Sequence, residues 1–147
     1  MINVKIKKLN ENAKVPARAT DGSAGADLYA LCDKDFVEIQ AHETVLIHTG
    51  LSFEIPDGYV GLVFARSSLG SKRGLAPANK VGVIDSDYRG ELMVSLHNHS
   101  EITQKIENEE RIAQLLIVPF LKANFILSDE LEDTDRGSGG FGSTGEK

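Results

Sequence analysis

The stretch TVLIHTGLSFEIP, residues 44–56, places apolar side chains at alternate positions over its second half. Leu51, Phe53 and Ile55 fall on one face of an extended chain, and polar side chains separate them. A period of two is the pattern of a strand with one buried face. The turn sequence PDG follows at residues 56–58. This segment therefore predicts a β-strand that ends in a tight turn.

The same period recurs on both sides of this segment. INVKIKK, residues 2–8, alternates in the same way, and ELMVSLHN, residues 91–98, puts Leu92, Val94 and Leu96 on one face. Short strands at intervals of roughly 8–12 residues, separated by turns, are typical of sandwiches, barrels and jelly rolls. The sequence therefore predicts an all-β fold, a jelly-roll-like β-barrel or sandwich.

Two segments are open to a helical interpretation. In EITQKIENEERIAQLLI, residues 101–117, Ile102 and Ile106 lie four apart, which would suit a helix. Period two also fits, and we favour two strands around the ENEE turn, the second of them stopped by Pro119. SSLGSK, residues 67–72, predicts a short helix whose start the serine hydroxyls could cap.

The composition is that of a single globular domain. The chain has 147 residues, of which 41% are hydrophobic and 26% charged. Its net charge of −6 argues against nonspecific binding to nucleic acid. With Cys32 as the one cysteine, no disulfide can form within the chain, which fits a reducing compartment. We see neither a signal-peptide pattern nor the ~18 apolar residues of a membrane span. We therefore expect a cytoplasmic protein with no nucleic-acid or membrane partner.

The C-terminal region differs from the rest of the chain. SDELEDTD, residues 128–135, is acidic, and RGSGGFGSTG, residues 136–145, is half glycine. Neither segment can bury enough apolar surface to fold alone. We therefore expect a compact catalytic body at residues 1–127 and a flexible arm at residues 128–147.

The few side chains of this arm suit a nucleotide. Arg136 offers a cation for phosphates and Phe141 offers a ring for a base, while glycines let backbone N–H groups approach an anion closely. Residues 137–142 also spell G-x-G-x-x-G, but that motif binds dinucleotides only between a strand and a helix, so we reject this interpretation. The hydroxyl donors of the arm are Ser138, Ser143 and Thr144.

Five stretches then carry a family resemblance. They are SAGADLYA (23–30), ARSSLGSKRG (65–74), NKVGVIDSDYRGELM (79–93), ERIAQLLI (110–117) and the glycine-rich arm. In this order they resemble the five motifs of the homotrimeric dUTP pyrophosphatases (dUTPases). The resemblance implies a β jelly roll, three chains around a threefold axis, and active sites between subunits that the arm of another chain closes as a lid. It also implies hydrolysis of dUTP to dUMP and pyrophosphate, which supplies dUMP for dTTP synthesis and limits uracil in DNA.

The resemblance assigns recognition of the nucleoside to residues 79–93, which look like a β-hairpin. It implies that Asn79 bonds a uracil carbonyl and that Tyr88 packs on the sugar, leaving no room for a ribose 2′-hydroxyl. A cytosine would leave polar groups of such a site unpaired. Backbone groups of Val83, Ile84 and Met93 complete the base edge in this assignment.

The catalytic residue that the resemblance implies is Asp85. The matching aspartate holds the 3′-hydroxyl or orients the attacking water as general base. Asp87 is the alternative, for which the family pattern gives a structural role. The water attacks the α-phosphorus with Mg²⁺ bound across the phosphates, and Asp27 is implied as an outer-shell ligand of Mg²⁺ through water.

Phosphate binding is implied for two further motifs and for the arm. Arg66, Ser67, Ser68 and Gly70 match the phosphate-binding motif. Gln114 would contact a phosphate or the water, and Arg111 would support the site from behind. In the arm, Arg136 pairs with the γ-phosphate and Phe141 stacks on uracil. The other arm residues implied in binding are Ser138, Gly142, Ser143 and Thr144.

Two alternative functions fit parts of this pattern. The dCTP deaminases share this fold and part of the motif set, but they carry a catalytic glutamate where this chain has Ser95, and they tend to read DPGW where residues 85–88 read DSDY. A non-enzymatic module on the same scaffold would be expected to lack Asp85 or the arm. His97 and His99 share a face of a strand and could form half a metal site, but we expect a structural or surface role.

Overall fold

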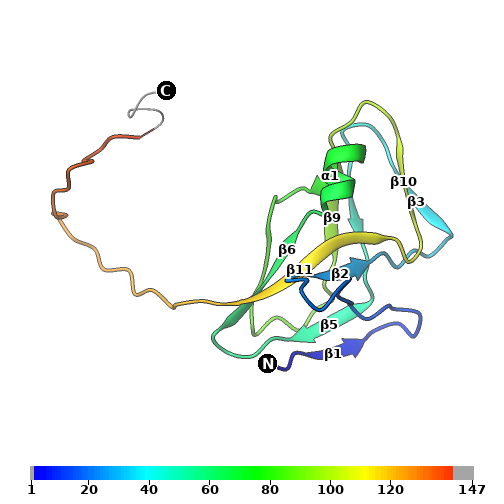
Figure 1. Cartoon of the computed structure of the whole chain (residues 1–147), viewed down its shortest axis with the longest axis horizontal. Coiled ribbons are helices and arrows are strands. Elements are labelled where there is room, and N and C mark those ends of the chain that lie inside the picture. Colours follow the sequence, from blue (N-terminus) through cyan, green and yellow to red (C-terminus); the bar gives the residue numbers. More distant parts are fainter. Residues whose placement is uncertain (1, 141–147) are drawn as a thin grey trace.

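Residues 2–140 are described by the computed structural model, and within them the chain forms eleven strands and one short helix (Figure 1). None of the helical structure in this range is long and apolar enough to cross a membrane. In chain order the elements are β1 (Lys5–Lys8), β2 (Ala26–Tyr29), β3 (Phe36–Ile39), β4 (Thr44–Ile47), β5 (Leu51–Glu54), β6 (Tyr59–Phe64), α1 (Ser67–Arg73), β7 (Leu75–Pro77), β8 (Gly82–Ile84), β9 (Val94–Asn98), β10 (Gln104–Glu107) and β11 (Arg111–Pro119).

The strands pair antiparallel in four groups. One sheet has the order β2-β11-β6-β8 and another the order β4-β9-β7, while β10-β3 and β1-β5 form two-stranded ribbons. On β11, Gln114 lies opposite both Asp27 of β2 and Phe64 of β6. This register brings three strands from distant parts of the sequence to one end of the sheet. The expected all-β, jelly-roll-like fold is confirmed.

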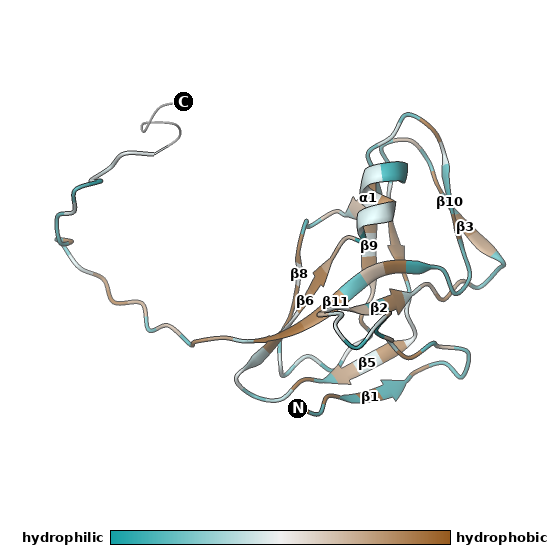
Figure 2. Cartoon of the chain, viewed as in Figure 1, coloured by the Kyte–Doolittle hydropathy of each residue, from teal (hydrophilic) through white to brown (hydrophobic). Residues whose placement is uncertain are grey.

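The alternating strands fill the hydrophobic core. Leu51 and Leu96 are fully buried, and Leu92 is only 1% exposed. Burying a side chain of this size stabilises the fold by about 1.5–3 kcal/mol. Figure 2 shows hydrophobic residues along β5, β9 and β11, whereas β1 is hydrophilic. The period-two pattern of residues 51–55 and 92–96 therefore identified two of the strands that build the core.

At the edge of the molecule the same pattern predicted the strand but not its burial. β1 pairs with β5, yet all its residues are exposed, and Ile6 is 36% exposed. A half-buried face is therefore wrong for Lys5–Lys8, although β5, its partner in the same two-stranded ribbon, is largely buried. The alternating pattern places Ser52 on the polar face of its strand, but the residue is buried. It is only 6% exposed, and its Oγ donates to the carbonyl of Arg89 at 2.8 Å.

The two ambiguous segments are settled by burial and pairing. Residues 104–107 and 111–119 are strands, as favoured, and β11 ends at Pro119 as expected. The helix α1 also starts at Ser67 as expected. Capping by the serine hydroxyls is wrong: the N-cap is Arg66 in an extended conformation, and this described N-terminus carries no side-chain cap hydrogen bond.

The expected hairpin over residues 79–93 is wrong in its pairing. β8 pairs with β6 instead of with the returning segment. That segment joins β5, because Ser52 and Glu91 form an isolated bridge and the Leu92 N–H donates to the Leu51 carbonyl at 2.8 Å. The three-residue β8 thus completes the edge of a larger sheet. The result is a wide loop at residues 85–93 in place of a ladder.

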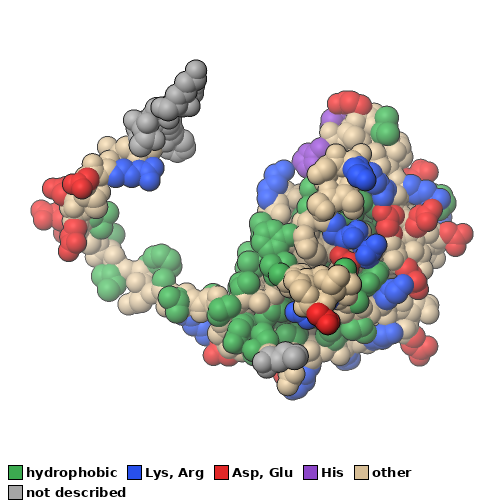
Figure 3. Space-filling model, viewed as in Figure 1, with side chains coloured by type: hydrophobic (Ala, Val, Ile, Leu, Met, Phe, Trp, Pro, Cys, Tyr) green, Lys and Arg blue, Asp and Glu red, His purple; other side chains and the backbone are tan. Residues whose placement is uncertain are grey.

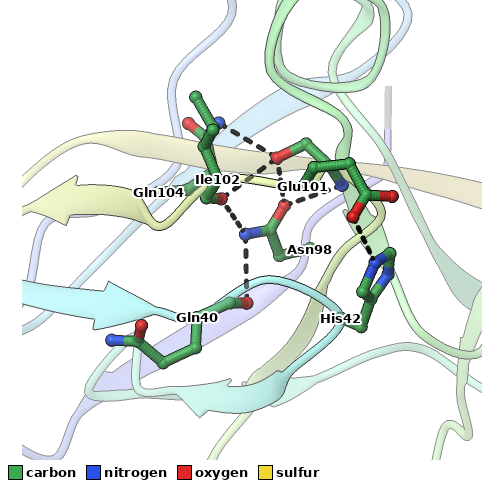
Figure 4. A network of polar contacts seen from close by, with 7 residues as sticks. Gln40, His42, Asn98, Glu101, Ile102 and Gln104 are labelled. Atoms are coloured by element: carbon green, nitrogen blue, oxygen red, sulfur yellow. Dashed lines mark hydrogen bonds and ion pairs between the residues drawn. The ribbon is translucent and has the colours of Figure 1, made fainter.

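A buried asparagine holds one end of the molecule together (Figure 4). Asn98, at the end of β9, is fully buried, and its Nδ2 lies 2.7–3.0 Å from the carbonyls of Ile39, Gln40 and Ile102. Its Oδ1 accepts hydrogen bonds from the N–H and the hydroxyl of Ser100. A buried polar side chain with its hydrogen bonds made fixes local structure. Asn98 therefore joins β9 to the end of β3 and to the loop before β10.

After β11 the chain leaves the body as an extended arm (Figure 1). Leu121, Phe125 and Leu127 are 94–98% exposed, and Figure 3 shows hydrophobic and acidic side chains projecting along this segment. These large apolar side chains are therefore not packed against the described body of the chain. The boundary between body and arm at residue 127 stays a proposal, and the last strand ends earlier, at Pro119.

Candidate active site

A broad hollow of about 740 Å³, here called the Asp27 hollow, opens where β2, β6 and β11 meet the start of α1. It gathers residues from four of the sequence motifs. The antiparallel register of β11 with β2 and β6 explains this, because it aligns positions 27, 64 and 114. The hollow is lined by Ala19, Ser23, Ala24, Gly25, Asp27, Phe64, Ala65, Arg66, Ser67, Lys80, Gln114 and Leu116.

Two arginines meet the carboxylate of Asp27, and one of them, Arg66, lines the hollow. Arg66 Nε donates to Asp27 Oδ1 at 2.8 Å, and Arg111 Nη1 lies 3.3 Å from Asp27 Oδ2. The side chain of Asp27 is 13% exposed, whereas that of Arg111 is 49% exposed. Two guanidinium groups on one carboxylate leave this cluster with a net positive charge. It is therefore suited to an anion that enters the hollow.

Close packing fixes the floor of the hollow. Gln114 Nε2 donates to the carbonyl of Ala65 at 2.9 Å, which orients the side-chain amide. A Cβ on Gly25 would lie 2.7 Å from Gln114 Oε1, so position 25 needs a glycine to admit this side chain. The amide nitrogen of Gln114 carries a second hydrogen that a bound oxygen could accept.

A second, smaller hollow of about 220 Å³, the Asp85 hollow, lies inside the loop at residues 85–93. The N–H of Tyr88 donates to the carbonyl of Asp85 at 3.2 Å, which forms the turn of this loop. Asp87 is not among the described residues that line the hollow, which favours Asp85 over this alternative. The hollow is lined by Leu46, Val83, Ile84, Asp85, Tyr88, Glu91, Leu92 and Met93.

The two hollows lie at opposite ends of the β6–β8 pair. Ile84, next to the Asp85 hollow, lies opposite Gly61, and Gly82 lies opposite Val63. From Gly61 to Phe64, where β6 ends, the chain rises by about 10 Å at roughly 3.3 Å per residue. Within this chain Asp85 and Tyr88 therefore line one hollow, whereas Arg66, Ser67 and Gln114 line the other.

The remaining expected residues lie outside both hollows or outside the described range. Asn79 is exposed in the turn before β8, and Gly70 lies within α1. Arg136 and Ser138 are exposed on the arm, where Arg136 Nε donates to the carbonyl of Gly139 at 2.9 Å. Ser68 is exposed at the start of α1. Four expected residues, Phe141, Gly142, Ser143 and Thr144, lie outside the described residues.

The described residues constrain how Mg²⁺ could be held. Within residues 2–140 no group of three or more His, Cys, Asp or Glu side chains is placed to bind a metal ion. Both oxygens of Asp27 face arginines, but each can accept a further hydrogen bond from a metal-bound water. Mg²⁺ keeps several waters and takes few carboxylates together with substrate phosphates. These residues therefore fit an ion held mainly by a triphosphate, with Asp27 in its outer shell.

His97, on β9, and His99, just after this strand, lie apart from both hollows. The ring centroids of His97 and His99 are 4.4 Å apart, so the expectation that they share a face is confirmed. The Nδ1 of His97 lies 2.8 Å from the hydroxyl of Thr44. Cys32 is half-buried, and burial raises the pKa of its thiol, which makes it a weaker nucleophile.

Two charged residues that line the hollows, Lys80 and Glu91, were not identified from the sequence. Lys80 lines the Asp27 hollow with φ of 64°, a conformation that its turn imposes and that residue type does not reveal. Glu91 lines the Asp85 hollow, and its carboxylate lies 2.9 Å from His48 Nδ1. The partners of this pair are 43 residues apart, so no local pattern could have revealed it.

Known proteins resemble this chain over nearly its whole length. The model of the dUTPase family matches residues 11–145. The deoxyuridine 5'-triphosphate nucleotidohydrolase of Nautilia profundicola is 50% identical over 144 residues, spanning 98% of this chain and 99% of that protein. The corresponding protein of Histophilus somni (strain 2336) is 50% identical over 149 residues, spanning 99% of this chain and 98% of that protein.

Solved structures share the fold as well. A mutant dUTPase of Staphylococcus bacteriophage 80alpha, with dUpNHpp, has a TM-score of 0.89 at 30% identity and covers 99% of both chains. A mutant dUTPase from phage phi11 of S. aureus, described for its coordination of a structural Mg(II) ion, has a TM-score of 0.80 at 26% identity. That comparison covers 90% of this chain and 100% of the phage chain.

Proposed function

Because the chain belongs to the dUTPase family, we propose that it hydrolyses dUTP to dUMP and pyrophosphate, which supplies dUMP for dTTP synthesis and limits uracil in DNA. This proposal rests on one observation: residues of the sequence motifs line two separate hollows. One hollow is built by the loop around Asp85 and Tyr88, and the other holds the arginine-flanked Asp27. A nucleoside suits the first, and a triphosphate suits the second.

The Asp85 hollow binds the deoxyribose and the uracil ring in this proposal. Tyr88 packs on the sugar and excludes a ribose 2′-hydroxyl, and Asn79 bonds a uracil carbonyl. The backbone of residues 83–84 and of Met93, which line the hollow, completes the base edge. A site built to hydrogen-bond one base edge rejects a base whose donors and acceptors do not match.

The Asp27 hollow binds the phosphates. Arg66 lies against Asp27, which orients its guanidinium, and the remaining N–H groups of Arg66 can donate to phosphate oxygens. Ser67 and Gln114 line the same hollow and add a hydroxyl and an amide. Ser68 and Gly70, on α1 beside this hollow, extend the phosphate site, and Arg111 supports Asp27 from behind.

Hydrolysis needs a water positioned at the α-phosphorus. Asp85 accepts a proton from that water as general base or holds the 3′-hydroxyl so that the phosphate chain is aligned. When bound, Mg²⁺ neutralises negative charge on the phosphates as pyrophosphate leaves. Arg66 and Gln114 stabilise the same charge from the protein side. No covalent intermediate with the chain is required.

The complete site is shared between chains of a homotrimer. The separation of the two hollows along β6 and β8 supports this proposal, since one nucleotide must reach Asp85 and Arg66 together. The exposed Leu121, Phe125 and Leu127 of the arm are consistent with a neighbouring chain that covers them.

The arm of residues 128–147 closes the shared site as a lid over the body of residues 1–127. Arg136 pairs with the γ-phosphate, and Phe141 stacks on uracil. A lid excludes water and completes the catalytic groups once substrate is bound. The enzyme works in the cytoplasm, which agrees with an unpaired half-buried cysteine. Ser138, Gly142, Ser143 and Thr144 donate to the triphosphate.

The proposed function is tested by separate incubation with dUTP, dCTP, dTTP and UTP. Release of pyrophosphate is measured alongside release of ammonia. We expect Mg²⁺-dependent pyrophosphate release from dUTP in large excess over the other nucleotides. Ammonia release from dCTP would instead identify a deaminase, and no reaction with any nucleotide would contradict an enzymatic function.

A further inference from the structure

The loop at residues 85–93, the Tyr88 loop, is bound to the turn between β4 and β5. The hydroxyl of Thr49 donates to the carbonyl of Leu92 at 2.5 Å, and the Leu92 N–H donates to the Leu51 carbonyl at 2.8 Å. The hydroxyl of Ser52 donates to the carbonyl of Arg89. These contacts join segments about forty positions apart in the chain. The shape of the Asp85 hollow therefore depends on the turn at residues 48–52.

Glu91 makes the side-chain contacts of this junction from the loop. Its Oε1 accepts a hydrogen bond from the N–H of Gly50 at 2.7 Å, and its Oε2 lies 2.9 Å from His48 Nδ1. The side chain of Glu91 is 20% exposed, so the two bonds are partly shielded from water. Burial raises the pKa of this carboxyl, but the hydrogen bonds from His48 and Gly50 outweigh burial and bring its pKa below the usual value. The carboxylate form is therefore the one that the fold stabilises.

The backbone conformation at residue 50 requires a glycine. Its φ of 67° lies in the left-handed region that favours glycine, and a Cβ there would lie 2.6 Å from Leu31 Cδ2. The N–H of Gly50 is thus held in a fixed direction, toward Glu91. The Glu91 carboxylate therefore binds the loop at residues 85–93 to one defined N–H group of the turn, and it is not merely a solvated surface charge.

The same residue also positions Tyr88. The hydroxyl of Tyr88 donates to the backbone carbonyl of Glu91 at 2.9 Å. The ring lies over Gly90, where a Cβ would come within 2.6 Å of Tyr88 Cζ. Glu91 therefore contacts the fixed turn with its side chain and the tyrosine hydroxyl with its backbone.

We propose that Glu91 is a positioning residue for sugar selection, because it holds Tyr88 in the place where the ring excludes a ribose 2′-hydroxyl. This inference rests on the proposed function. Glu91 acts through Tyr88, and its partner His48 sets the direction of the carboxylate. Removal of the carboxylate loosens the ring, so that UTP is admitted better while dUTP is still hydrolysed.

The test compares Glu91→Ala and Glu91→Gln with wild type, using kcat and KM for dUTP and for UTP. Glu101→Ala is the matched control, since Glu101 also pairs with a histidine, His42, at 3.2 Å but lies on the surface with its side chain 87% exposed. For Glu91→Ala we expect the dUTP/UTP ratio of kcat/KM to fall about tenfold, the effect of one lost hydrogen bond to a charged group. Glu91→Gln should recover much of the ratio, because its amide oxygen can still accept from Gly50. Glu101→Ala should match wild type.

Gly90→Ala is a second route to the same effect. Its added Cβ displaces the Tyr88 ring without changing the carboxylate, so it should also lower the dUTP/UTP ratio. Unchanged ratios in both Glu91→Ala and Gly90→Ala, or equal losses with both nucleotides, would overturn the inference while leaving dUTP hydrolysis by wild type in place. If wild type fails to hydrolyse dUTP, the proposed function is wrong, and the inference is overturned with it.

Discussion

Arg66 and Asp27, 39 positions apart in the chain, meet at 2.8 Å between Nε and Oδ1. β11 lies between β2, which carries Asp27, and β6, which ends at Phe64 just before Arg66, and it sets the register of the two strands. The side chains of Arg66 and Asp27 are 23% and 13% exposed, so the ion pair is partly shielded from water. The position of the guanidinium in the proposed phosphate site is thus a consequence of sheet pairing.

Replacing Asp27 with Asn should weaken both stability and binding. The change leaves Arg66 and Arg111 without their anion, and we expect a loss of about 2 kcal/mol in the free energy of unfolding. Because a carboxylate no longer holds the guanidinium of Arg66, KM for dUTP should rise by a larger factor than kcat falls. Thermal unfolding and steady-state kinetics measure these effects. Asp57→Asn, which removes the exposed partner of Lys122, is the control and should change little. A fully stable Asp27→Asn with wild-type KM would contradict this role.

Mixed trimers test the shared site. Asp85→Asn inactivates the nucleoside hollow and Arg66→Ala inactivates the phosphate hollow, so each variant alone should be nearly inactive. If each site takes one hollow from each of two chains, every mixed cyclic trimer contains one intact site and reaches about one third of wild-type activity. Co-refolding of differently tagged variants, followed by purification of the mixed species, measures this. Mixed trimers as inactive as the parents would place both hollows of a site in one chain.

Asn98→Ala should be among the most destabilising polar substitutions in the body. It removes the buried partner of three carbonyls and of Ser100. Leaving several buried groups unpaired costs about 3 kcal/mol or more. Chemical denaturation measures the loss, with Asn108→Ala as control, since Asn108 is exposed and its side chain accepts a hydrogen bond from the backbone of Cys32. A loss for Asn98→Ala no larger than for the control would mean that this network contributes little.

The Glu91 carboxylate makes stability depend on pH in a defined direction. Its pKa is lower in the folded chain than the usual value of about 4.3, because the hydrogen bonds from His48 and Gly50 outweigh burial. Its contribution is therefore present above that pH and is lost as the pH falls through the folded pKa. We expect the stability difference between wild type and Glu91→Gln to be constant from pH 7 to about 5 and to shrink below. A difference that grows on acidification would contradict the sign.

Local patterns predicted most of the fold. The alternation at Leu51, Phe53 and Ile55 and the turn after it specify a strand whatever its neighbours are. The burial of Ser52 and the pairing of β8 with β6 depend on contacts with Arg89 and with Gly61, which lie far away in sequence. Short-range periodicity contains no information about such partners.

Some features of the candidate site could likewise be predicted from local sequence patterns, and others could not. Asp85, Tyr88, Arg66 and Asp27 were identified because they lie in contiguous motifs with fixed spacing. Their separation into two hollows follows from the sheet register and could not be predicted from spacing. The role of Glu91 depends on its contact with the turn at residues 48–50, so it became visible only in three dimensions.

The most direct test of catalysis by Asp85 is pyrophosphate release from dUTP by wild type and by Asp85→Asn, with the affinity of each for dUpNHpp measured in parallel. We predict turnover at least about 10²-fold slower in the variant, the usual loss on removing a general base, with analogue affinity within severalfold of wild type. Equal turnover by the two proteins would contradict the assignment of Asp85 as the catalytic residue.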